Sequence, residues 1–396
     1  MIPKNWSLLA LSEITKEKIS YGIVQAGPHV ENGIPYIKSA DVGGEINVNG
    51  LQKTAPEIHH KYRRSAVHPN DIVFSLRGNI ARTSIVPQNL PEANLTQGTA
   101  RISVDNDNDT KFVYYKLASI PVLNRINALS KGSTFKEISL EELRKVKLSL
   151  PPLPEQQKIA KILSTWDKAI STTEKLIETS KQQKKALMQQ LLTGKKRLLN
   201  PETGKAFNGD WEKVELSQIA LITMGSSPKS DAYNEIGDGL PLLQGNADIK
   251  FRKSAPRIHT SQITKECVIG DILLSVRAPV GSVALSLHNA CIGRGLACIR
   301  AKKTNSQEYL YQWLLSFEPK WERFSQGSTF EAVNSNDIKS LHVLQPSFSE
   351  QQKIASVLTA ADKETEVLQA KLVNLKQEKK ALMQQLLSGK RRVKFS

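Results

Sequence analysis

A proline-free stretch from Glu155 to Arg197 constrains the architecture of this chain more than any other feature. Gly194, near its end, is its only glycine, and apolar residues recur at steps of three and four. This spacing is typical of a coiled-coil helix, in which one apolar stripe faces a partner helix. The stretch therefore predicts one long helix that needs a helical partner. The stripe consists of Ile159, Leu163, Trp166, Ile170, Ile177, Leu187 and Leu191, with Thr173, Ser180 and Lys184 at its weaker positions.

A matching helix is encoded later in the same chain. Adding 195 to each position gives a second stripe, from Ile354 to Leu386, without any gap. The segments EQQKIA and KKALMQQLL occur in both copies letter for letter. We expect the two helices to form an antiparallel coiled coil in which each weak position meets an apolar one, for example Thr365 near Ile177.

The regions before the two long helices also repeat, but their offset drifts. NDIVFSLR at Asn70 corresponds to GDILLSVR at Gly270, an offset of 200, whereas GSTF at Gly132 and Gly327 has an offset of 195. The helix thus keeps its length while the globular part accepts insertions and deletions. The predicted fold class is α+β, with two mixed α/β domains, each followed by a long helix, and pseudo-twofold symmetry between the halves. The predicted boundaries are 1–153 for the first domain, 154–198 for the first helix, 199–348 for a linker and the second domain, and 349–396 for the second helix and a basic tail.

Each globular part is expected to contain a β-hairpin, because apolar, β-branched runs flank a tight turn. The predicted strands are 71–77 with 80–86, and 271–277 with 280–287. Short helices are expected at 111–117, at 307–315 and after Ser139, whose hydroxyl can cap a helix.

The ends of the long helices also carry local signals. Ser349 and Gln352 predict a capping box for the second helix, and Gly194 and Gly389 suit the left-handed residue that ends a helix. The basic clusters 195–197 and 390–392 follow these glycines. They either complement the negative helix ends or contact DNA phosphates.

Composition limits the class of partner. A net charge of +17 over 396 residues favours nucleic acid, because clustered Lys and Arg release counterions from phosphate. No apolar run is long enough to span a bilayer, and the amino-terminal residues show no secretory pattern, so we expect a cytoplasmic protein without membrane contact. The three cysteines form no CxxC pair, which argues against a disulfide framework or a structural zinc site.

No catalytic constellation is recognisable in the sequence. It has no GxGxxG after a strand, no GxxxxGK[ST] loop and no Asn-Pro-Pro-Tyr or Asp-Pro-Pro-Tyr motif of amino-methyltransferases. His59 and His60 are adjacent, but neighbours on a strand point to opposite faces and no matching carboxylate accompanies them. Ser75 and Ser275 lack a GxSxG setting. We therefore expect no catalytic residue, metal site or cofactor on this chain.

The candidates for reading DNA are polar residues beside turns, because their side chains can hydrogen-bond base edges. They lie on the two hairpins, after two matching strands (YIKSADV and LLQGNADI) and in the two GSTF loops. A solvated loop or an internal hydrogen bond is the alternative for each of them. The candidates are Lys38, Ser39, Arg77, Asn79, Arg82, Ser133, Thr134, Gln244, Asn246, Arg277, Ser328 and Thr329.

Together these features resemble the specificity subunits of type I restriction–modification systems. The resemblance covers nearly the whole chain. It rests on LPPLPEQQKIAKIL and SFSEQQKIASVL at the helix starts, and on KKALMQQLLTGKKRL and KKALMQQLLSGKRRV at their ends. DIVFSLRG, DILLSVRA and the GSTF segments resemble framework motifs of the family's target-recognition domains. RAPVG replaces the glycine turn of the first hairpin in the second one.

The resemblance implies that each domain reads one half of a two-part site in double-stranded DNA. The paired helices would set the gap and dock two methyltransferase (modification) subunits, with Gln156, Lys158, Gln351 and Lys353 as candidate contacts. Those subunits would methylate adenine with S-adenosylmethionine, and restriction subunits would translocate and cut DNA with ATP and Mg²⁺. No cofactor would bind this chain. The alternative is a DNA-binding coiled-coil scaffold that recruits another effector, and a stand-alone methyltransferase or nuclease ranks below both.

Overall fold

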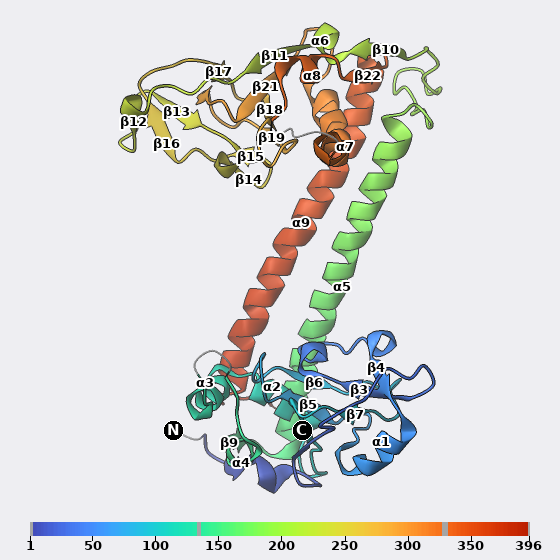
Figure 1. Ribbon diagram of the computed structural model, residues 1–396, viewed down its shortest axis with the longest axis vertical. Coiled ribbons are helices and arrows are strands. Elements are labelled where there is room, and N and C mark those ends of the chain that lie inside the picture. The colour runs from blue at the N-terminus through green and yellow to red at the C-terminus, as the bar shows by residue number, and fades with distance from the viewer. Residues whose placement is uncertain (1–2, 133–135, 327–331, 395–396) are drawn as a thin grey trace. The chain divides into compact units, whose positions relative to one another are not determined.

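The computed structural model describes residues 3–132, 136–326 and 332–394, and it divides into two compact units (Figure 1). Unit 1 comprises Met1–Glu174 and Lys371–Ser396, and unit 2 comprises Lys175–Ala370. Two helices of 39 residues each, α5 (Leu153–Leu191) and α9 (Phe348–Leu386), contribute one segment to each unit. Each unit therefore combines one globular domain with a stretch of both long helices. None of the helices in the described ranges is long and apolar enough to cross a membrane.

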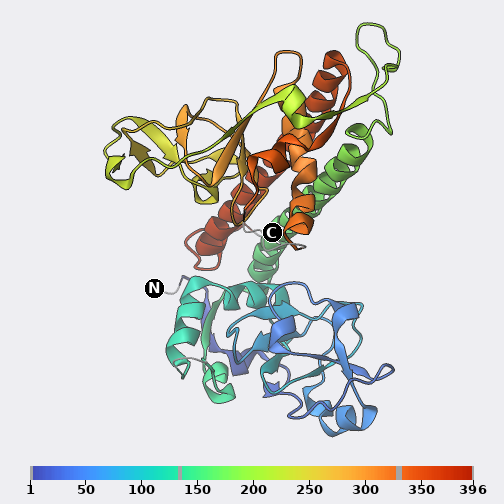
Figure 2. The same cartoon turned by 45° about the horizontal axis from the view of Figure 1, so that its top comes forward.

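The globular part of unit 1 contains two small sheets and a strand pair. The sheets have the strand orders β2-β8-β5-β6 and β4-β3-β7, and β1 pairs with β9. Helix α2 lies beside the first turns of α5 (Figure 2). The strands are β1 (Ser7–Ala10), β2 (Ser20–Tyr21), β3 (Ile34–Ile37), β4 (Gln52–Thr54), β5 (Ile72–Ser75), β6 (Thr83–Ile85), β7 (Asn94–Leu95), β8 (Thr99–Ile102) and β9 (Lys147–Leu150), and the helices are α1 (Pro56–Lys61), α2 (Thr110–Leu117), α3 (Ile120–Leu129) and α4 (Leu140–Arg144).

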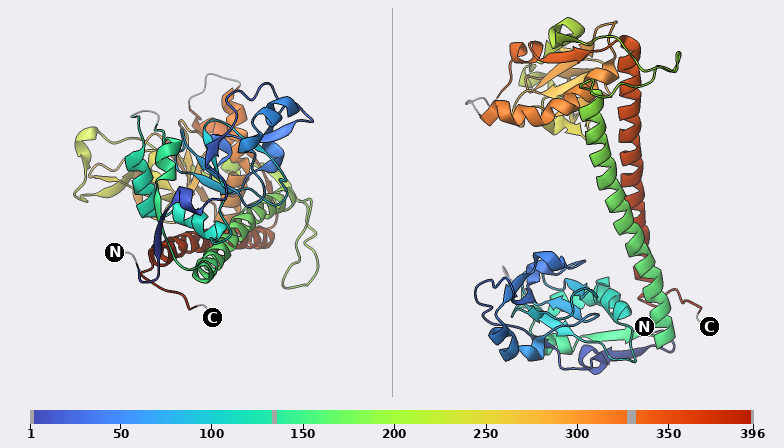
Figure 3. Two further views of the ribbon diagram at one scale, coloured as in Figure 1. Left: turned by 90° about the horizontal axis from the view of Figure 1, so that it is seen from below. Right: turned by 90° about the vertical axis from the view of Figure 1, so that its right-hand side faces the viewer.

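Unit 2 repeats this arrangement with sheets that contain more strands. Their strand orders are β11-β21-β18-β19-β15-β14 and β12-β16-β13-β20-β17, and β10 pairs with β22. Helix α7 lies against the first of these sheets (Figure 3). The strands are β10 (Glu212–Glu215), β11 (Ala220–Met224), β12 (Tyr233–Asn234), β13 (Leu240–Leu243), β14 (Ile249–Lys250), β15 (Lys253–Ser254), β16 (Ile258–Thr260), β17 (Glu266–Cys267), β18 (Ile272–Ser275), β19 (Val283–Leu285), β20 (Ala290–Ile292), β21 (Leu296–Ala301) and β22 (His342–Gln345), and the helices are α6 (Leu216–Ile219), α7 (Gln307–Gln326) and α8 (Ser335–Lys339).

The first strand of each predicted hairpin lies between two hydrophobic cores. In β5, Ile72 and Phe74 join the core that contains the start of α5, whereas Val73 joins a second core on the other face. Strand β18 does the same with Leu274 on one side and Leu273 on the other. Successive side chains of a strand point to opposite faces, so a strand with successive apolar residues buries both faces. The antiparallel pairs β5–β6 and β18–β19 confirm the predicted hairpins.

The long helices pack antiparallel, as ion pairs within each unit show. In unit 1 Lys379 binds Asp167, and in unit 2 Lys184 Nζ lies 2.6 Å from Asp362 Oδ1. Adding 195 converts Asp167 into Asp362 and Lys184 into Lys379. The two ion pairs are therefore the same contact, made once in each unit. Together with the mixed helices and sheets of both units, they confirm the predicted α+β fold class and the antiparallel pairing of the long helices.

A second repeated ion pair joins the end of each long helix to the start of the other. Glu350 accepts two hydrogen bonds from Arg197, at 2.7 and 2.8 Å, and Glu155 accepts two from Arg392, both at 2.7 Å. Both carboxylates are buried. One arginine of each basic cluster, Arg197 or Arg392, is thus bound by a buried carboxylate, which is a role that was not predicted from the sequence. Gly194 and Gly389 have φ of 70° and 68°, as their predicted place at the helix ends requires.

Several local predictions were wrong in detail. Ser180 Oγ lies 2.8 Å from Thr365 Oγ1, so these two weak stripe positions meet each other, not an apolar residue. Helix α9 begins at Phe348, and the hydroxyl that accepts a bond from the backbone N–H of Glu350 belongs to Ser347, not Ser349. His59 and His60 lie on helix α1, not on a strand, and His59 Nδ1 is 2.7 Å from the side-chain amide of Asn94.

Candidate nucleic-acid interface

A buried serine fixes the hairpin turn in each unit. The Ser75 hydroxyl donates to the carbonyl of Arg77 at 3.1 Å, and the Ser275 hydroxyl lies 3.0 Å from the carbonyl of Arg277 and 2.8 Å from that of Pro279. Both serines are buried, whereas Arg77 and Arg277 are exposed. The serines therefore hold the turns that present the arginines, which leaves no reason to assign them a nucleophile's role.

The strands before the second candidate region end in matching turns. The backbone N–H of Lys38 donates to Asp41 Oδ2 at 2.8 Å, and that of Gln244 donates to Asp248 Oδ2 at the same distance. Each aspartate is the last residue of a short 3₁₀ turn, Ser39–Asp41 in unit 1 and Asn246–Asp248 in unit 2. The candidates Lys38 and Gln244 are thus positioned by the same framework, although their chemistry differs.

A glycine lets a third loop approach the end of β13. A Cβ on Gly295 would lie 2.3 Å from the carbonyl oxygen of Gln244, far closer than van der Waals contact allows. The backbone N–H of Gly295 donates to that oxygen at 3.1 Å. Gly293 is similarly close, since its Cβ would lie 3.1 Å from the Cα of Gln244. Arg294, between the two glycines, is therefore presented next to Gln244 on a closely packed backbone.

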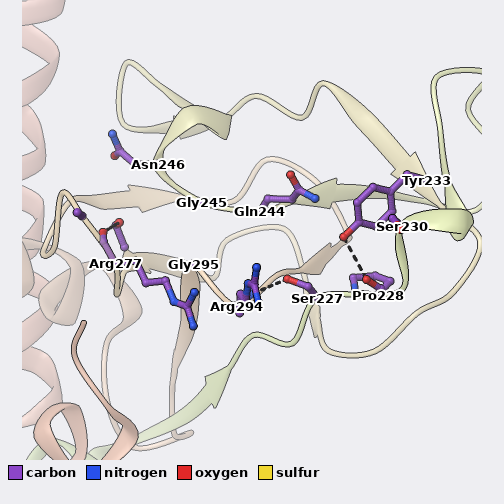
Figure 4. Close-up of a pocket in the computed structure, with 12 residues that line it drawn as sticks. Ser227, Pro228, Ser230, Tyr233, Gln244, Gly245, Asn246, Arg277, Arg294 and Gly295 are labelled. Carbon is purple, nitrogen blue, oxygen red and sulfur yellow. Dashed lines mark hydrogen bonds between the residues drawn. The ribbon is translucent and has the colours of Figure 1, made fainter. Parts of the chain in front are cut away.

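These elements enclose a pocket of 620 Å³ in unit 2 (Figure 4). It brings together three of the predicted residues, Gln244, Asn246 and Arg277, which are 33 positions apart from first to last in the sequence. No acidic side chain is among the described residues that line it. The full lining consists of Ser227, Pro228, Ser230, Tyr233, Gln244, Gly245, Asn246, Ser275, Arg277, Ala278, Arg294 and Gly295.

The pocket also contains residues that the sequence did not single out. Arg294 is exposed at its rim, and its backbone N–H donates to the hydroxyl of Ser227 at 3.2 Å. The Tyr233 hydroxyl donates to the carbonyl of Pro228 at 3.1 Å. Arginine guanidinium groups can bind the O6 and N7 acceptors of guanine, and Gln or Asn amides can bind adenine. The pocket therefore combines two cations and two amides that suit the edges of base pairs.

Comparisons with known proteins decide the family. A family model described as "Type I restriction modification DNA specificity domain" matches residues 3–182 and again residues 208–377. The chain belongs to this family. The match occurs twice, so this specificity subunit carries two DNA-specificity domains, and its role is recognition, not catalysis.

Individual relatives agree with this assignment. The putative type I restriction enzyme MjaX specificity subunit of Methanocaldococcus jannaschii is 32% identical over 99% of this chain and 95% of that protein. The EcoBI specificity subunit of Escherichia coli is 29% identical over 56% of this chain and 48% of that protein. Among solved structures, the HsdS subunit from Thermoanaerobacter tengcongensis has a TM-score of 0.52 at 22% identity, covering 98% of each chain. The type I S subunit from M. genitalium has a TM-score of 0.63 at 15% identity, covering 99% of this chain and 97% of that one.

Unit 1 of this specificity subunit presents its arginine differently. Arg77 Nε lies 2.7 Å from Glu137 Oε1, and both side chains are nearly half exposed. The residue at the position of Glu137 in unit 2 is Ala332, which forms the equivalent bridge with Arg277. An ion pair this exposed contributes only about 0–1 kcal/mol, so Arg77 can exchange Glu137 for another partner at little cost.

The remaining candidates of the first hairpin lie beside Arg77. Asn79 and Arg82 are exposed, and Arg82 passes Gly43, where a Cβ would lie 2.9 Å from its Cδ. The loop equivalent to that of Arg294 carries Gln97 in unit 1, because GTARI aligns with GLACI. Its glycine, Gly98, accepts a hydrogen bond from the Ser39 hydroxyl at 2.8 Å. The units thus share a framework but differ in where the charged residue lies. Lys38 of unit 1 corresponds to Gln244 of unit 2, whereas Gln97 of unit 1 corresponds to Arg294 of unit 2.

The other end of β18 is secured by a buried carboxylate. Asp271 accepts two hydrogen bonds from Arg300, both at 2.7 Å, and one from the backbone N–H of Val268. Burial acts to raise the pKa of Asp271, but these bonds outweigh it and leave the pKa below its ordinary value. The carboxylate therefore stays charged at neutral pH and fixes the strand that leads to Arg277.

Two of the candidate partner contacts are contradicted by burial. The side-chain amide of Gln156 bonds the backbone N–H of Asp109, the side chain of Asn108 and the carbonyl of Pro151. Gln351 does the same with Ser306, Asn305 and Pro346 in unit 2. Both glutamines are at most 2% exposed, so they attach the long helices to their own domains and do not face a partner.

The two lysines predicted to contact a partner lie on the surface, whereas the predicted residues of the GSTF loops are not described. Lys158 is exposed and Lys353 is partly exposed, so both are accessible to another protein. The predicted Ser133, Thr134, Ser328 and Thr329 lie outside the described residues.

Proposed function

We propose that this specificity subunit reads a two-part, non-palindromic site in double-stranded DNA, one half with each domain. The pocket that gathers Arg277, Arg294, Gln244 and Asn246 carries this proposal. In it, the arginines would bind guanine and the amides adenine through the major groove. The net charge of +17 would add sequence-independent attraction to phosphate.

The second half of the site would be read by the equivalent positions of unit 1. These are Lys38, Ser39, Arg77 and Gln97, with Asn79 and Arg82 on the same hairpin. Because cations and amides occupy exchanged positions in the two units, the same framework would favour different bases. This exchange supports two unlike half-sites over a palindrome.

The long helices would set the gap between the half-sites. A helix of 39 residues extends roughly 60 Å at 1.5 Å per residue. At 3.4 Å per base-pair step this length corresponds to roughly 18 base pairs, which is room for two half-sites with a gap. Both helices lack insertions relative to each other, as a spacer of fixed length requires.

Substitution of the hairpin arginines tests the division of the site. Arg77→Ala should relax the choice of base at one half-site and Arg277→Ala at the other, each by about 1–3 kcal/mol if the arginine binds guanine bidentately. The measurement is competition binding against a set of single-base variants of the site.

Lys303→Ala is the matched control, because this exposed cation follows the far end of β21. It should weaken binding to all sequences alike or leave binding unchanged. If Arg77→Ala or Arg277→Ala weakened binding to all sequences alike, the arginine concerned would be a phosphate contact and would not read a base.

The catalytic partners are the second part of the proposal. Two methyltransferase subunits would dock on the helices, using exposed residues such as Lys158 and Lys353, and would bind S-adenosylmethionine. Restriction subunits with ATP and Mg²⁺ would add translocation and cleavage. The purified chain should then neither methylate nor cut DNA, and adenine methylation should arise only when a methyltransferase subunit is added.

The alternative role, a scaffold for another effector, predicts a different result in the same assay. No methyltransferase would co-purify with the chain, and adding one would not produce methylation at a defined site. Adenine methylation by the chain alone, free of contaminants, would contradict both roles.

A further inference from the structure

A tight hairpin in unit 2 exposes an aromatic side chain at its tip. Strands β14 and β15 pair through Lys250 and Lys253, so Phe251 and Arg252 are the only loop residues. Their φ angles are 49° and 58°, the left-handed region that Asn and Gly favour in such two-residue turns. Phe251 is 96% exposed. Neither the usual residue preference of such a turn nor packing in the core therefore explains a phenylalanine at this position.

The tip is firmly attached to the domain. The Arg252 guanidinium binds both carboxylate oxygens of Glu318 on α7, at 2.6 and 2.8 Å, and the carbonyl of Val283 at 3.1 Å. Glu318 also accepts the backbone N–H of Val283 at 2.8 Å. The neighbouring phenylalanine is therefore held on a rigid support, so little conformational entropy is lost when it meets a ligand.

Strand register places this tip beside the DNA-reading elements. Strand β15 runs parallel to β19, with Lys253 opposite Leu285, and β19 begins just after the turn that carries Arg277. The residues before Lys253 therefore lie towards the same end of the sheet as that turn. Adjacent strands are about 4.8 Å apart, so Phe251 and the Arg277 turn belong to one surface. The exposed Lys250 and Lys253 flank the phenylalanine with positive charge.

We propose that Phe251 is a wedge that inserts between stacked base pairs in the half-site bound by unit 2. Apolar side chains that enter a base step unstack and kink the duplex, and flanking lysines would neutralise the adjacent phosphates. The inference rests on the proposed DNA-reading role of unit 2. Unit 1 has Gly43 and Gly44 after its corresponding aspartate turn, so only one half-site would be deformed.

Fluorescence of 2-aminopurine can detect the unstacked step. The full chain, assembled with its methyltransferase subunit, is bound to duplexes that carry 2-aminopurine at successive positions through the unit 2 half-site. Fluorescence should rise at one step with the native chain and stay low with Phe251→Ala. The same substitution should weaken DNA binding by roughly 5- to 150-fold, the loss typical of one base–aromatic stacking contact.

The unfolding temperature separates loss of the wedge from misfolding, because misfolding would lower it. Phe251→Gly removes a strained backbone conformation, so the unfolding temperature should rise while DNA affinity falls. Ile269→Ala is the matched control, because Ile269 is 64% exposed before the opposite end of β18. It should change neither fluorescence nor affinity.

The possible failures are distinguishable. Unchanged fluorescence and affinity with Phe251→Ala, while Arg277→Ala loses discrimination, would overturn the wedge and leave the proposed function intact. Loss of methyltransferase association without loss of DNA affinity would make Phe251 a protein contact and also overturn the wedge. If Arg277→Ala and Phe251→Ala both left binding unchanged, the proposed reading of DNA by unit 2 would fail as well.

Discussion

Removal of one heptad from each long helix is expected to shorten the gap of the recognition site by about three base pairs. Deleting 171–177 and 366–372 preserves the phase of the apolar stripe. Each helix loses about 10 Å at 1.5 Å per residue, and 3.4 Å corresponds to one base pair. The deletion leaves the Asp167–Lys379 and Lys184–Asp362 ion pairs intact within their units. The measurement is the gap in the methylated sites of cells that carry the variant and its partner.

The deletion also rotates the two domains relative to each other about the duplex, so loss of DNA binding is the second expected outcome. Three base pairs turn the duplex by roughly a third of its 10.5-pair period, so binding is lost if the domains cannot follow. Deletion of a heptad from α5 alone is the control, because it mismatches the two helices and should prevent assembly. A folded, active double-deletion variant that methylates sites with the original gap would show that the helices do not set the spacing.

Loss of the arginine that closes a helix end is expected to have the largest effect on stability. Arg197→Ala removes both guanidinium bonds of Glu350, whose side chain is only 1% exposed, and leaves it with the indole N–H of Trp211 at 3.1 Å. Breaking a buried ion pair from one side costs about 3–5 kcal/mol, because the remaining charge stays buried. At about 2–4 °C per kcal/mol for a unit of this size, the unfolding temperature should fall by roughly 6–20 °C.

The repeat supplies the matched comparison for this substitution. Arg392→Ala breaks the equivalent pair with Glu155 and should destabilise unit 1 by a similar amount. Lys195→Ala removes an exposed charge in the same basic cluster and should change stability by less than about 0.5 kcal/mol. Equal unfolding temperatures for Arg197→Ala and Lys195→Ala would mean that these clusters act at the helix ends only through general electrostatics.

Local periodicity explains why the long helices and hairpins could be predicted. A stripe repeated over 39 residues, and an apolar run beside a turn, are written in neighbouring positions. The pairing of Ser180 with Thr365 could not be read in the same way. It depends on the register between two helices, which the ion pairs of Asp167 and Asp362 help to determine. Helix α7 extends beyond its predicted end because Phe317 and Trp321 bury against the core, and Pro319 does not interrupt it.

The candidate site was only partly predictable for a related reason. Arg277, Gln244 and Asn246 follow strands that the repeat identifies, so their neighbourhood could be inferred. Arg294 has no periodic signal, and its importance follows from two glycines that let its loop approach Gln244. The same glycines, in IGRGL, are the one sequence feature that could have indicated it. The prediction that Gln156 and Gln351 contact a partner was wrong, because a repeated polar residue at a helix start is compatible with a partner contact and with an internal hydrogen bond alike.

The map of methylated adenines in cells that carry this chain with its methyltransferase subunit tests the central claim most directly. The account predicts two unlike half-sites separated by a fixed gap, with Arg77→Ala relaxing bases in one half and Arg277→Ala relaxing bases in the other. A continuous or palindromic consensus, or two variants that relax the same positions, would contradict it.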